Sequence, residues 1–314
     1  MKAIGVWEYG GPERLEEIEL PDPEPGEGEV RIRVHAATVN PTDTLLRAGV
    51  HAKRLGDRKP PFVPGMDAAG VLEAVGPGVD GRLRVGQRVI ALVVPTGPHG
   101  GAYAERIVLP AASVVPAPTG ADLPAASTLL MNALTARMTL DALALAPGDT
   151  VAVTGAAGTL GGYVIQLAKA DGLRVVADAK PADEALVREL GADHVVARGD
   201  GVTDRIRSLA PGGVPGLVDA AVLNEAVFPA IADGGGLATI RGWRGPGERG
   251  IRVHPVLVSE RATDTDALDR LRRQVEEGAL TLRVADVLPA ARAGEAHRRL
   301  AEGGVRGRLV LDFS

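Results

Sequence analysis

The chain has 314 residues, and its 35 Lys and Arg against 40 Asp and Glu give a formal net charge of -5. It contains no cysteine, which excludes disulfides, thiolate zinc sites, iron–sulfur clusters and cysteine nucleophiles. The acidic balance and the lack of a long basic run predict no nucleic-acid partner. Because no secretory signal and no run of eighteen apolar residues is present, we expect a cytoplasmic protein with no membrane partner.

The first part of the chain, to about residue 120, predicts an antiparallel β-domain. Short runs of alternating apolar and polar residues follow one another here, separated by clusters of Pro and Gly. These runs are EVRIRVHAA, GVLEAVG, GQRVIALVV and YAERIVLP. Period-two alternation with this punctuation is typical of an antiparallel barrel or sandwich.

Residues 121–262 change to strands that alternate with helices. The expected strands are TVAVTG, LRVVADA, HVVA, GLVDAAV and GLATIRG. Between them, segments such as LGGYVIQLAKA and ADEALVREL carry apolar residues at helical spacing. This alternation predicts an α/β fold, a doubly wound parallel sheet with helices on both faces.

Residues 263–314 contain a further helix, strand, helix and strand. Their sequences are ALDRLRRQVEEG, LRVADVLP, GEAHRRLAEGG and GRLVLDF. The pattern leaves open whether they extend the parallel sheet or return to the first domain.

The segment TGAAGTLGG joins an apolar strand directly to an apolar helix, with glycines spaced three apart. Unpaired amides and the dipole at such a helix start favour an anion, so the segment predicts a site for a dinucleotide pyrophosphate. Gly158 would permit close approach of a phosphate, and Gly161 would let the helix pack on the strand. The cofactor-binding residues expected in this turn are Gly155, Ala157, Gly158, Thr159 and Leu160.

The choice between NADPH and NADH depends on residues at the ends of the next two strands. Asp178 lies at the distance from the turn where an acid accepts the ribose 2′-hydroxyl of NAD. Lys180 and Arg198 lie where cations would bind the 2′-phosphate of NADP. We expect NADPH, with NADH as the alternative that Asp178 supports.

Further motifs carry a family resemblance. They are AATVNPTD, PFVPGMDAAGVLEAVGPGV, VGQRVIAL, GGAYAERIVLP, LTA and LGADHVV. With the glycine turn, and in this order, they resemble the zinc-free quinone oxidoreductase branch of the medium-chain dehydrogenase/reductases. The resemblance implies an α/β protein with a GroES-like antiparallel β-barrel catalytic domain plus a doubly wound Rossmann domain.

The resemblance also implies a domain order and an assembly. Residues 1–120 would form the N-terminal part of the catalytic domain, 121–262 the Rossmann NADP-binding domain, and 263–314 the return to the catalytic domain. A homodimer or homotetramer that pairs through the Rossmann domain is implied, with IRVHPVLV as the edge strand.

The zinc-dependent relatives provide a contrast. Where they place a catalytic Cys this chain has Asn40, and where they have His-Glu it has Met66 and Asp67. An amide and a thioether are poor zinc ligands, so no metal is expected. The chemistry implied is hydride transfer from NADPH to a quinone or an α,β-unsaturated carbonyl, with the protein orienting the cofactor.

By resemblance, Asn40 and Asp43 of the Asn-Pro-x-Asp turn would lie beside the nicotinamide as candidate catalytic residues, the alternative being local capping. His51 is a third candidate, which would orient or protonate a carbonyl oxygen or else be a solvated loop residue. The remaining cofactor-binding residues implied are Thr135, Ile240, Arg241, Gly242 and Arg308.

Three alternatives remain open at this point. Lys53, Arg54, Arg58 and Lys59 indicate either attraction of acidic substrates or a charged surface loop. The alternative enzyme activity is reduction of enoyl thioesters, which other members of the superfamily catalyse. The third alternative is a cofactor-binding protein without significant catalysis.

Overall fold

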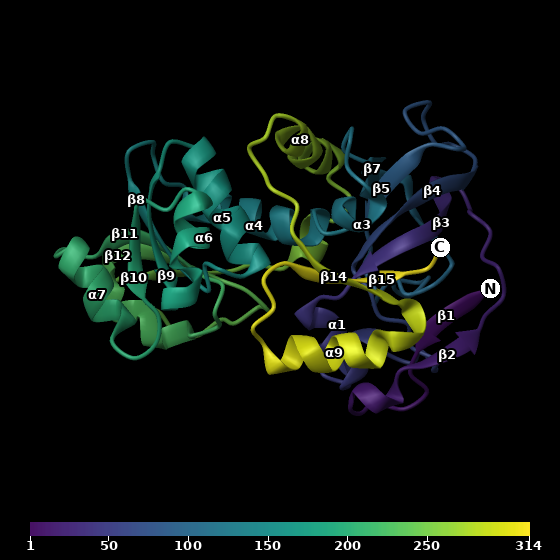
Figure 1. Cartoon of the computed structure of the whole chain (residues 1–314), viewed down its shortest axis with the longest axis horizontal. Helices are drawn as coiled ribbons and strands as arrows, with labels where there is room; N and C mark the ends of the chain where they lie inside the picture. The colour runs from purple at the N-terminus through teal and green to yellow at the C-terminus, as the bar shows by residue number, and fades with distance from the viewer. The chain divides into compact units, whose positions relative to one another are not determined.

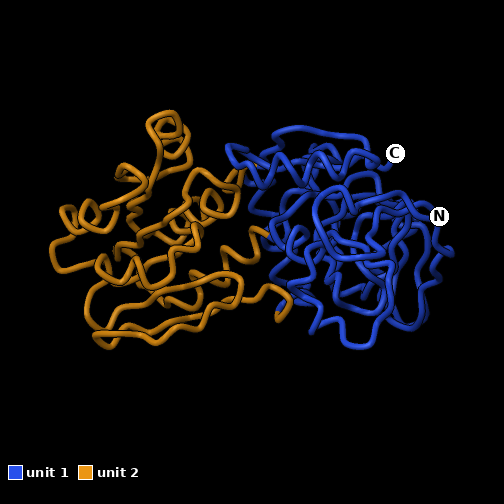
Figure 2. The backbone as a smooth tube through the Cα atoms, turned by 90° about the horizontal axis from the view of Figure 1, so that it is seen from below, with its two compact units in different colours: residues 1–131, 261–277, 282–314 blue, residues 132–260, 278–281 orange.

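The structure, a computed structural model, describes all residues 1–314, and its contacts divide the chain into two compact units (Figure 2). Unit 1 comprises Met1–Met131, Arg261–Glu277 and Leu282–Ser314, and unit 2 comprises Asn132–Glu260 and Gly278–Thr281. The domain boundaries proposed from the sequence stay a prediction, because such units are defined by contacts and not by independent folding.

A seven-stranded sheet is the framework of unit 1. Its strands follow the order β14-β15-β3-β4-β5-β7, with β6 paired with β3. They are β3 (Glu29–Thr38), β4 (Asp67–Val75), β5 (Arg88–Leu92), β6 (Arg106–Pro110), β7 (Val114–Pro116), β14 (Val284–Pro289) and β15 (Arg308–Asp312). All neighbouring strands are antiparallel except the pair β14 and β15. The predicted antiparallel β-domain is therefore confirmed.

Alternation along the strands decides which side chains form the core of unit 1. In β3, Val30, Ile32 and Val34 are buried, while Arg31 and Arg33 between them are not. Leu309 and Leu311 of β15 are buried in the same cluster. The last strands of the chain thus belong to the sheet of unit 1, which answers the choice that the sequence pattern left open.

Short helices and one small sheet complete unit 1. The small sheet pairs β1 (Lys2–Gly5) with β2 (Glu16–Glu19). The helices are α1 (Pro41–Arg47), α2 (Ala52–Leu55), α3 (Leu123–Ala126), α8 (Thr265–Glu276) and α9 (Ala293–Glu302). Helix α8 is fixed beside β7, since Thr265 Oγ1 donates to the Ala112 carbonyl at 2.8 Å and Glu276 accepts from the Thr119 amide at 2.8 Å.

Unit 2 contains a parallel sheet of six strands in the order β10-β9-β8-β11-β12-β13. They are β8 (Thr150–Thr154), β9 (Arg174–Ala179), β10 (His194–Ala197), β11 (Val214–Asp219), β12 (Ile231–Thr239) and β13 (Arg252–Pro255). Helices α5 (Thr159–Ala170), α6 (Glu184–Glu189) and α7 (Val202–Leu209) pack around it (Figure 1). The predicted doubly wound sheet is confirmed.

The strand order has a functional consequence. Strands β9 and β10 follow β8 toward one edge of the sheet, whereas β11, β12 and β13 continue toward the other. The carboxyl ends of β8 and β11 therefore flank the topological switch point, where open α/β sheets bind ligands. Helix α4 (Leu130–Leu143) precedes β8 in the chain.

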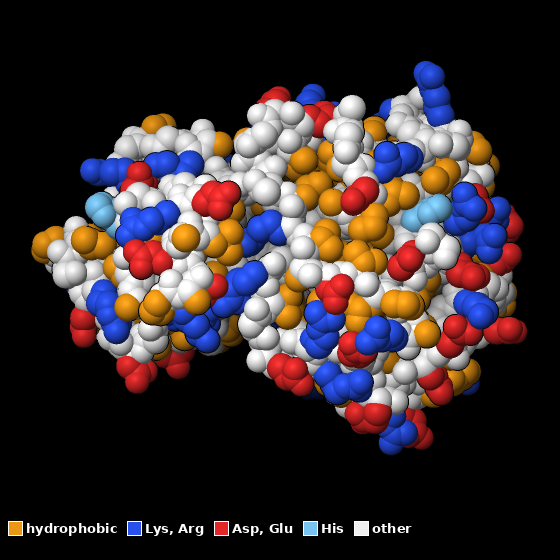
Figure 3. Space-filling model, in the orientation of Figure 1, with side chains coloured by type: hydrophobic (Ala, Val, Ile, Leu, Met, Phe, Trp, Pro, Cys, Tyr) orange, Lys and Arg blue, Asp and Glu red, His pale blue; other side chains and the backbone are white.

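None of the helices combines the length and the apolar character needed to span a lipid bilayer. On the face drawn in Figure 3, acidic and basic side chains are interspersed with apolar ones.

Candidate active site

Three glycines let the turn after β8 come into close backbone contact with its surroundings. Gly155 has φ +69°, and a Cβ there would lie 2.9 Å from the carbonyl carbon of Ala220. A Cβ at Gly161 would lie 2.4 Å from the Gly155 oxygen, and one at Gly158 would lie 3.1 Å from the same atom. Glycine is therefore required at 155 by conformation and at 161 by packing, the latter in line with the role predicted for Gly161.

Helix α5 starts directly on this turn, at the switch point. Gly158 is its N-cap and supplies no side-chain cap, and the first turn of an α-helix leaves amide groups without intrahelical partners. The Thr159 side-chain oxygen is buried and has no hydrogen-bond partner in the structure. Since a buried hydroxyl without a partner costs free energy, an oxygen-rich ligand at this point would satisfy it.

Asp178 lies against the same turn, near the end of β9. Its Oδ1 accepts from the Ala156 amide at 3.1 Å, and Arg198 Nε lies 4.0 Å from Oδ2. Burial raises the pKa of Asp178, whereas the Ala156 amide and the Arg198 charge oppose that increase. The carboxylate, in a side chain that is 1% exposed, thus holds the glycine turn in place.

Lys180 and Arg198 are exposed at the ends of neighbouring strands. The Arg198 amide donates to the Ala179 carbonyl at 2.9 Å, which places the two cations side by side along the carboxyl edge of the sheet. The Arg198 side chain is 43% exposed, and Lys180 is exposed as well. Both cations are exposed at this edge, and the ion pair that Arg198 forms, with Asp178, is a long one at 4.0 Å.

Strand β11 ends in an acid that the sequence analysis missed. Asp219 is buried and accepts from Thr154 Oγ1 at 2.7 Å, from the Ala221 amide at 3.1 Å and from the Asn224 amide at 2.7 Å. Val222 in the loop after β11 has φ +60°, a left-handed conformation that is strained for a β-branched residue. Asp219 thus ties a strained loop to the end of β8. The sequence signal that could have identified Asp219 is its place at the end of the apolar run GLVDA.

The segment predicted to pass near the nicotinamide follows β12. Arg241 and Gly242 have φ of +60° and +74°, and Thr239 Oγ1 donates to the Trp243 carbonyl at 2.8 Å, closing the turn. The structure thereby gathers most of the predicted cofactor residues at the carboxyl ends of the strands of unit 2. They are Gly155, Ala157, Gly158, Thr159, Leu160, Asp178, Lys180, Arg198, Ile240, Arg241 and Gly242. Thr135 is buried on α4.

In unit 1, Asn40 lies at the start of α1 in a buried polar cluster. Its Nδ2 donates to Asp67 Oδ2 at 2.8 Å, and Asp67 Oδ1 accepts from the Met131 amide at 2.8 Å. Burial raises the pKa of Asp67 to about 6, although the Arg308 charge acts in the opposite direction. The cluster therefore brings together Asn40 and Arg308, which the sequence assigned separately.

Asp43 receives three hydrogen bonds from its surroundings. Its carboxylate accepts from the Asn40 amide at 2.8 Å, from the Gly65 amide at 3.1 Å and from the Tyr103 hydroxyl at 3.2 Å. Burial raises its pKa to about 7, against the effect of these donors. The local capping weighed in the sequence analysis is present, and a direct catalytic role for Asp43 stays a prediction.

A chain of buried groups leads away from Asp43. The Tyr103 hydroxyl lies 3.2 Å from His297 Nε2, and Arg47 Nη1 lies 3.4 Å from His297 Nδ1. Because a guanidinium only donates, Nδ1 accepts and Nε2 carries the hydrogen, so Tyr103 is left to donate to Asp43. Burial, with the Arg47 charge, lowers the pKa of His297 to about 3.

The sequence analysis did not anticipate Tyr103 and His297. A signal for His297 existed, since it follows Ala293 by four residues on the face of α9 that is buried. His51, by contrast, lies partly buried at the start of α2. Burial and the Arg54 charge lower its pKa.

The three residues compared with those of the zinc enzymes make contacts within unit 1. Met66 Sδ lies 3.0 Å from Thr42 Oγ1, and the Asn40 amide nitrogen donates to Asp67. The structure contains no group of three or more His, Asp or Glu side chains arranged to hold a metal ion.

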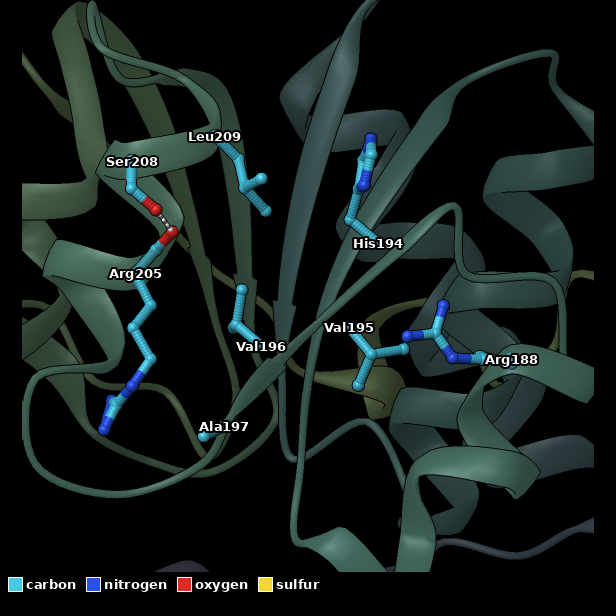
Figure 4. A pocket seen from close by; sticks show the side chains of 8 residues that line it. All are labelled: Arg188, His194, Val195, Val196, Ala197, Arg205, Ser208 and Leu209. Carbon is cyan, nitrogen blue, oxygen red and sulfur yellow. Dashed lines mark hydrogen bonds between the residues drawn. The ribbon is translucent and has the colours of Figure 1, made fainter.

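A pocket of about 370 Å³ lies elsewhere in unit 2, along the edge strand β10 (Figure 4). It is lined by Arg188, His194, Val195, Val196, Ala197, Arg205, Ser208 and Leu209. Arg188 pairs with Glu184 at 2.6 Å, and Arg205 donates to the Asp200 carbonyl at 2.8 Å. Both cations therefore already have partners within the protein. None of the predicted site residues lines this pocket.

Comparison with known proteins connects this geometry to a family. The model of the alcohol dehydrogenase GroES-like domain matches residues 26–119, and the zinc-binding dehydrogenase model matches residues 190–311. The quinone oxidoreductase of Sus scrofa is 29% identical over 330 residues, covering 99% of this chain and 97% of that protein. A solved NAD-dependent alcohol dehydrogenase is 33% identical with a TM-score of 0.86, and 100% of each chain is covered. A mycobacterial protein solved in complex with NADPH is 30% identical with a TM-score of 0.88, covering 99% of this chain and 100% of that chain.

The chain belongs to the medium-chain dehydrogenase/reductase superfamily, in its quinone oxidoreductase branch. For this member of the superfamily, the GroES-like match lies within unit 1. The second match runs from the later strands of unit 2 into the C-terminal strands of unit 1. The resemblance and the fold class derived from it are both confirmed.

Proposed function

We propose that this chain is an oxidoreductase that uses NADPH to reduce quinones, and that it works without a metal ion. The observation that carries the proposal is the start of α5. There, a glycine turn at the switch point precedes a buried Thr159 hydroxyl that has no hydrogen-bond partner. A pyrophosphate supplies the oxygens that this hydroxyl and the first-turn amides would bind.

The preference for NADPH over NADH follows from the hydrogen bonding of Asp178 within the protein. Its carboxylate is buried against the turn, where it accepts from the Ala156 amide. Lys180 and Arg198 are exposed at the neighbouring strand ends and favour a 2′-phosphate. The relative solved with NADPH supports this assignment, although another relative is named as NAD-dependent.

When bound, NADPH supplies a hydride, and a quinone that takes this hydride and one proton becomes a hydroquinone. Asn40 would orient the cofactor, with its amide held by Asp67. Asp43, backed by Tyr103 and His297, would position Asn40 and the Gly65 backbone. The proton would come from solvent or from His51.

Metal independence is supported by donor chemistry. Asn40 offers an amide and Met66 a thioether where zinc enzymes of the superfamily have thiolate and imidazole. An α,β-unsaturated carbonyl, being similarly electrophilic, would be a second substrate class. Reduction of enoyl thioesters is the alternative that the comparisons favour less, since the relatives matched over their full length are named quinone oxidoreductases.

The test is steady-state oxidation of NADPH by a quinone, an enone and an enoyl thioester, with and without EDTA. We expect turnover with the quinone, unchanged by the chelator. Turnover of the thioester alone would contradict the substrate class. Activity lost to EDTA and restored by a divalent ion would contradict metal independence.

We also propose a homodimer or homotetramer formed through the sheet of unit 2. Strand β13 lies at its edge and pairs only with β12, so its outer side is available to a second copy. Light scattering over a range of concentrations tests this. A Val253→Lys variant should lower the measured mass, and a monomeric unmodified protein would contradict the proposal.

A further inference from the structure

An exposed aromatic surface lies in unit 1, beside the segment that follows α1. Trp7 is 52% exposed and Tyr9 is 37% exposed, and they are the only aromatic residues among the large apolar side chains that stay exposed. Val50 is 63% exposed. We call Trp7, Tyr9, Val50 and Phe62 the aromatic surface. Apolar groups gathered at a surface mark a binding site more often than isolated ones do.

Backbone contacts hold the aromatic surface in place. Val6 and Phe62 exchange two hydrogen bonds, at 3.0 and 2.9 Å, which fix the segments that carry Trp7, Tyr9 and Phe62. The Tyr9 and Phe62 rings stack with centroids 5.1 Å apart and planes 5° from parallel. A Cβ at Gly49 would lie 2.8 Å from the Tyr9 ring, so the ring rests directly on backbone. These contacts therefore hold the Tyr9 ring in a fixed orientation.

Four cations lie in the chain segment between Val50 and Phe62 of the aromatic surface. Residues 53–59 contain Lys53, Arg54, Arg58 and Lys59, against the single acid Asp57. None of these four cations forms an ion pair, whereas many arginines elsewhere in the chain do. Like charges held close together repel one another, and a bound anion relieves that repulsion.

We infer that the aromatic surface and the cations of residues 53–59 together bind the substrate, and that the preferred quinones are planar ring systems carrying a carboxylate or sulfonate. The inference rests on the proposed function for the reaction itself. A planar ring stacks on aromatic side chains, and the anionic substituent would lie toward the cations. Helix α1 connects this region to Asn40, since Asn40 is its N-cap and Gly49 follows its C-cap, Ala48.

The test compares a naphthoquinone sulfonate with the same naphthoquinone lacking the sulfonate. In K53Q/R54Q/R58Q/K59Q, kcat/KM for the sulfonate should fall about tenfold or more, with loss of its dependence on salt. For the neutral quinone, kcat/KM should stay within about twofold. The matched control is R33Q/R84Q/R270Q/R298Q, which removes the same charge from exposed arginines elsewhere in unit 1. An equal fall in the control, or none in the first variant, overturns the inference.

A binding measurement separates this inference from the proposed function. The chain has two Trp, so Trp243→Phe leaves Trp7 as the only indole reporter. Without NADPH, the naphthoquinone sulfonate should quench Trp7 fluorescence, and the quadruple loop variant should require about tenfold more of it. Quenching without any turnover would reject the proposed function and keep the binding site. Turnover of both quinones at equal rates, with quenching unaffected by the loop variant, would reject the binding site and keep the proposed function.

Discussion

Single polar residues at the carboxyl edge of the parallel sheet differ in whether the protein already supplies their hydrogen-bond or ion-pair partners. Asp178 and Asp219 are buried and accept hydrogen bonds from neighbouring loops. Thr159 is buried with an oxygen that has no partner, while Lys180 and Arg198 extend into solvent. In the proposed function, Asp178 and Asp219 would shape the site. Thr159, Lys180 and Arg198, whose one ion pair is the 4.0 Å contact with Asp178, would contact the ligand.

Removing the two exposed cations should separate the cofactors. In Lys180→Ala/Arg198→Ala, affinity for NADPH should fall at least about tenfold, because a charged hydrogen bond contributes about 1.5–3 kcal/mol. NADH, which lacks the 2′-phosphate, should bind as before. Titration calorimetry with both cofactors measures this, and Arg174→Ala, at the opposite end of β9, is the control. Equal losses for NADPH and NADH would rule out a phosphate contact.

The strained Val222 gives a second prediction at this scale. A non-glycine residue at φ +60° stores about 1–3 kcal/mol, more than glycine costs through the entropy of the unfolded chain. Val222→Gly should therefore raise the free energy of unfolding in urea, by about 0.5–1 kcal/mol. Leu223→Gly is the control, since Leu223 has φ -84° and should lose stability. A loss in both variants would show that the Val222 side chain stabilises the loop.

At the scale of elements, the contact between α5 and the turn depends on one missing side chain. A Cβ at position 161 would meet the Gly155 oxygen at 2.4 Å and the Ala156 Cα at 2.7 Å, and both atoms are backbone. Helix α5 would have to move away from the turn to admit it. The start of α5 and the glycine turn would then no longer face the same ligand.

Gly161→Ala should lower the free energy of unfolding by about 1–3 kcal/mol, the usual cost of overpacking. Gly161→Ala should also weaken NADPH binding. A packing defect elsewhere in unit 2 would leave NADPH binding unchanged. Gly212→Ala is the matched control, because no atom lies within 4 Å of a Cβ there. Intact NADPH affinity in Gly161→Ala would show that the turn adapts without cost.

The elements show how far sequence alone reaches. Alternation and the glycine spacing predicted most strands of both sheets and the turn, because both signals are local. The short strand β7 was missed. The residue pattern alone did not place β14 and β15, although the family resemblance implied their return to the first domain. Their place depends on which strand pairs with β15, and Leu311 lies opposite the distant Ala37. Tyr103 and His297 were missed for the same reason, as their contact joins residues far apart in the chain.

Considered as a whole, the molecule holds buried titratable groups with opposing effects on its stability. Burial raises the pKa of Asp43 to about 7 and that of Asp67 to about 6. The folded protein keeps protons on both that the unfolded chain releases above about pH 4. Their contribution is therefore complete at low pH and is lost as the pH rises through 6 and 7. His297, with its lowered pKa, has the opposite dependence.

Substituting His297 should isolate its share of this pH dependence. The folded protein keeps His297 neutral down to about pH 3, while the unfolded chain protonates it near pH 6.5. The unfolded chain thus binds one more proton in this window, and stability that is complete above pH 6.5 is lost as the pH falls toward 3. Gln keeps a donor and an acceptor between Arg47 and Tyr103 but takes up no proton.

The measurement is urea unfolding of the unmodified protein and of His297→Gln from pH 6.5 to pH 5. Relative to the unmodified protein, the variant should gain about 2 kcal/mol across this window, at about 1.4 kcal/mol per pH unit. The two raised carboxyl groups are present in both proteins, so their effects largely cancel in the difference. His194→Gln, at an exposed histidine of unit 2, is the control. A difference that stays constant with pH would mean that folded His297 takes up a proton, and Nδ1 would then no longer accept from Arg47.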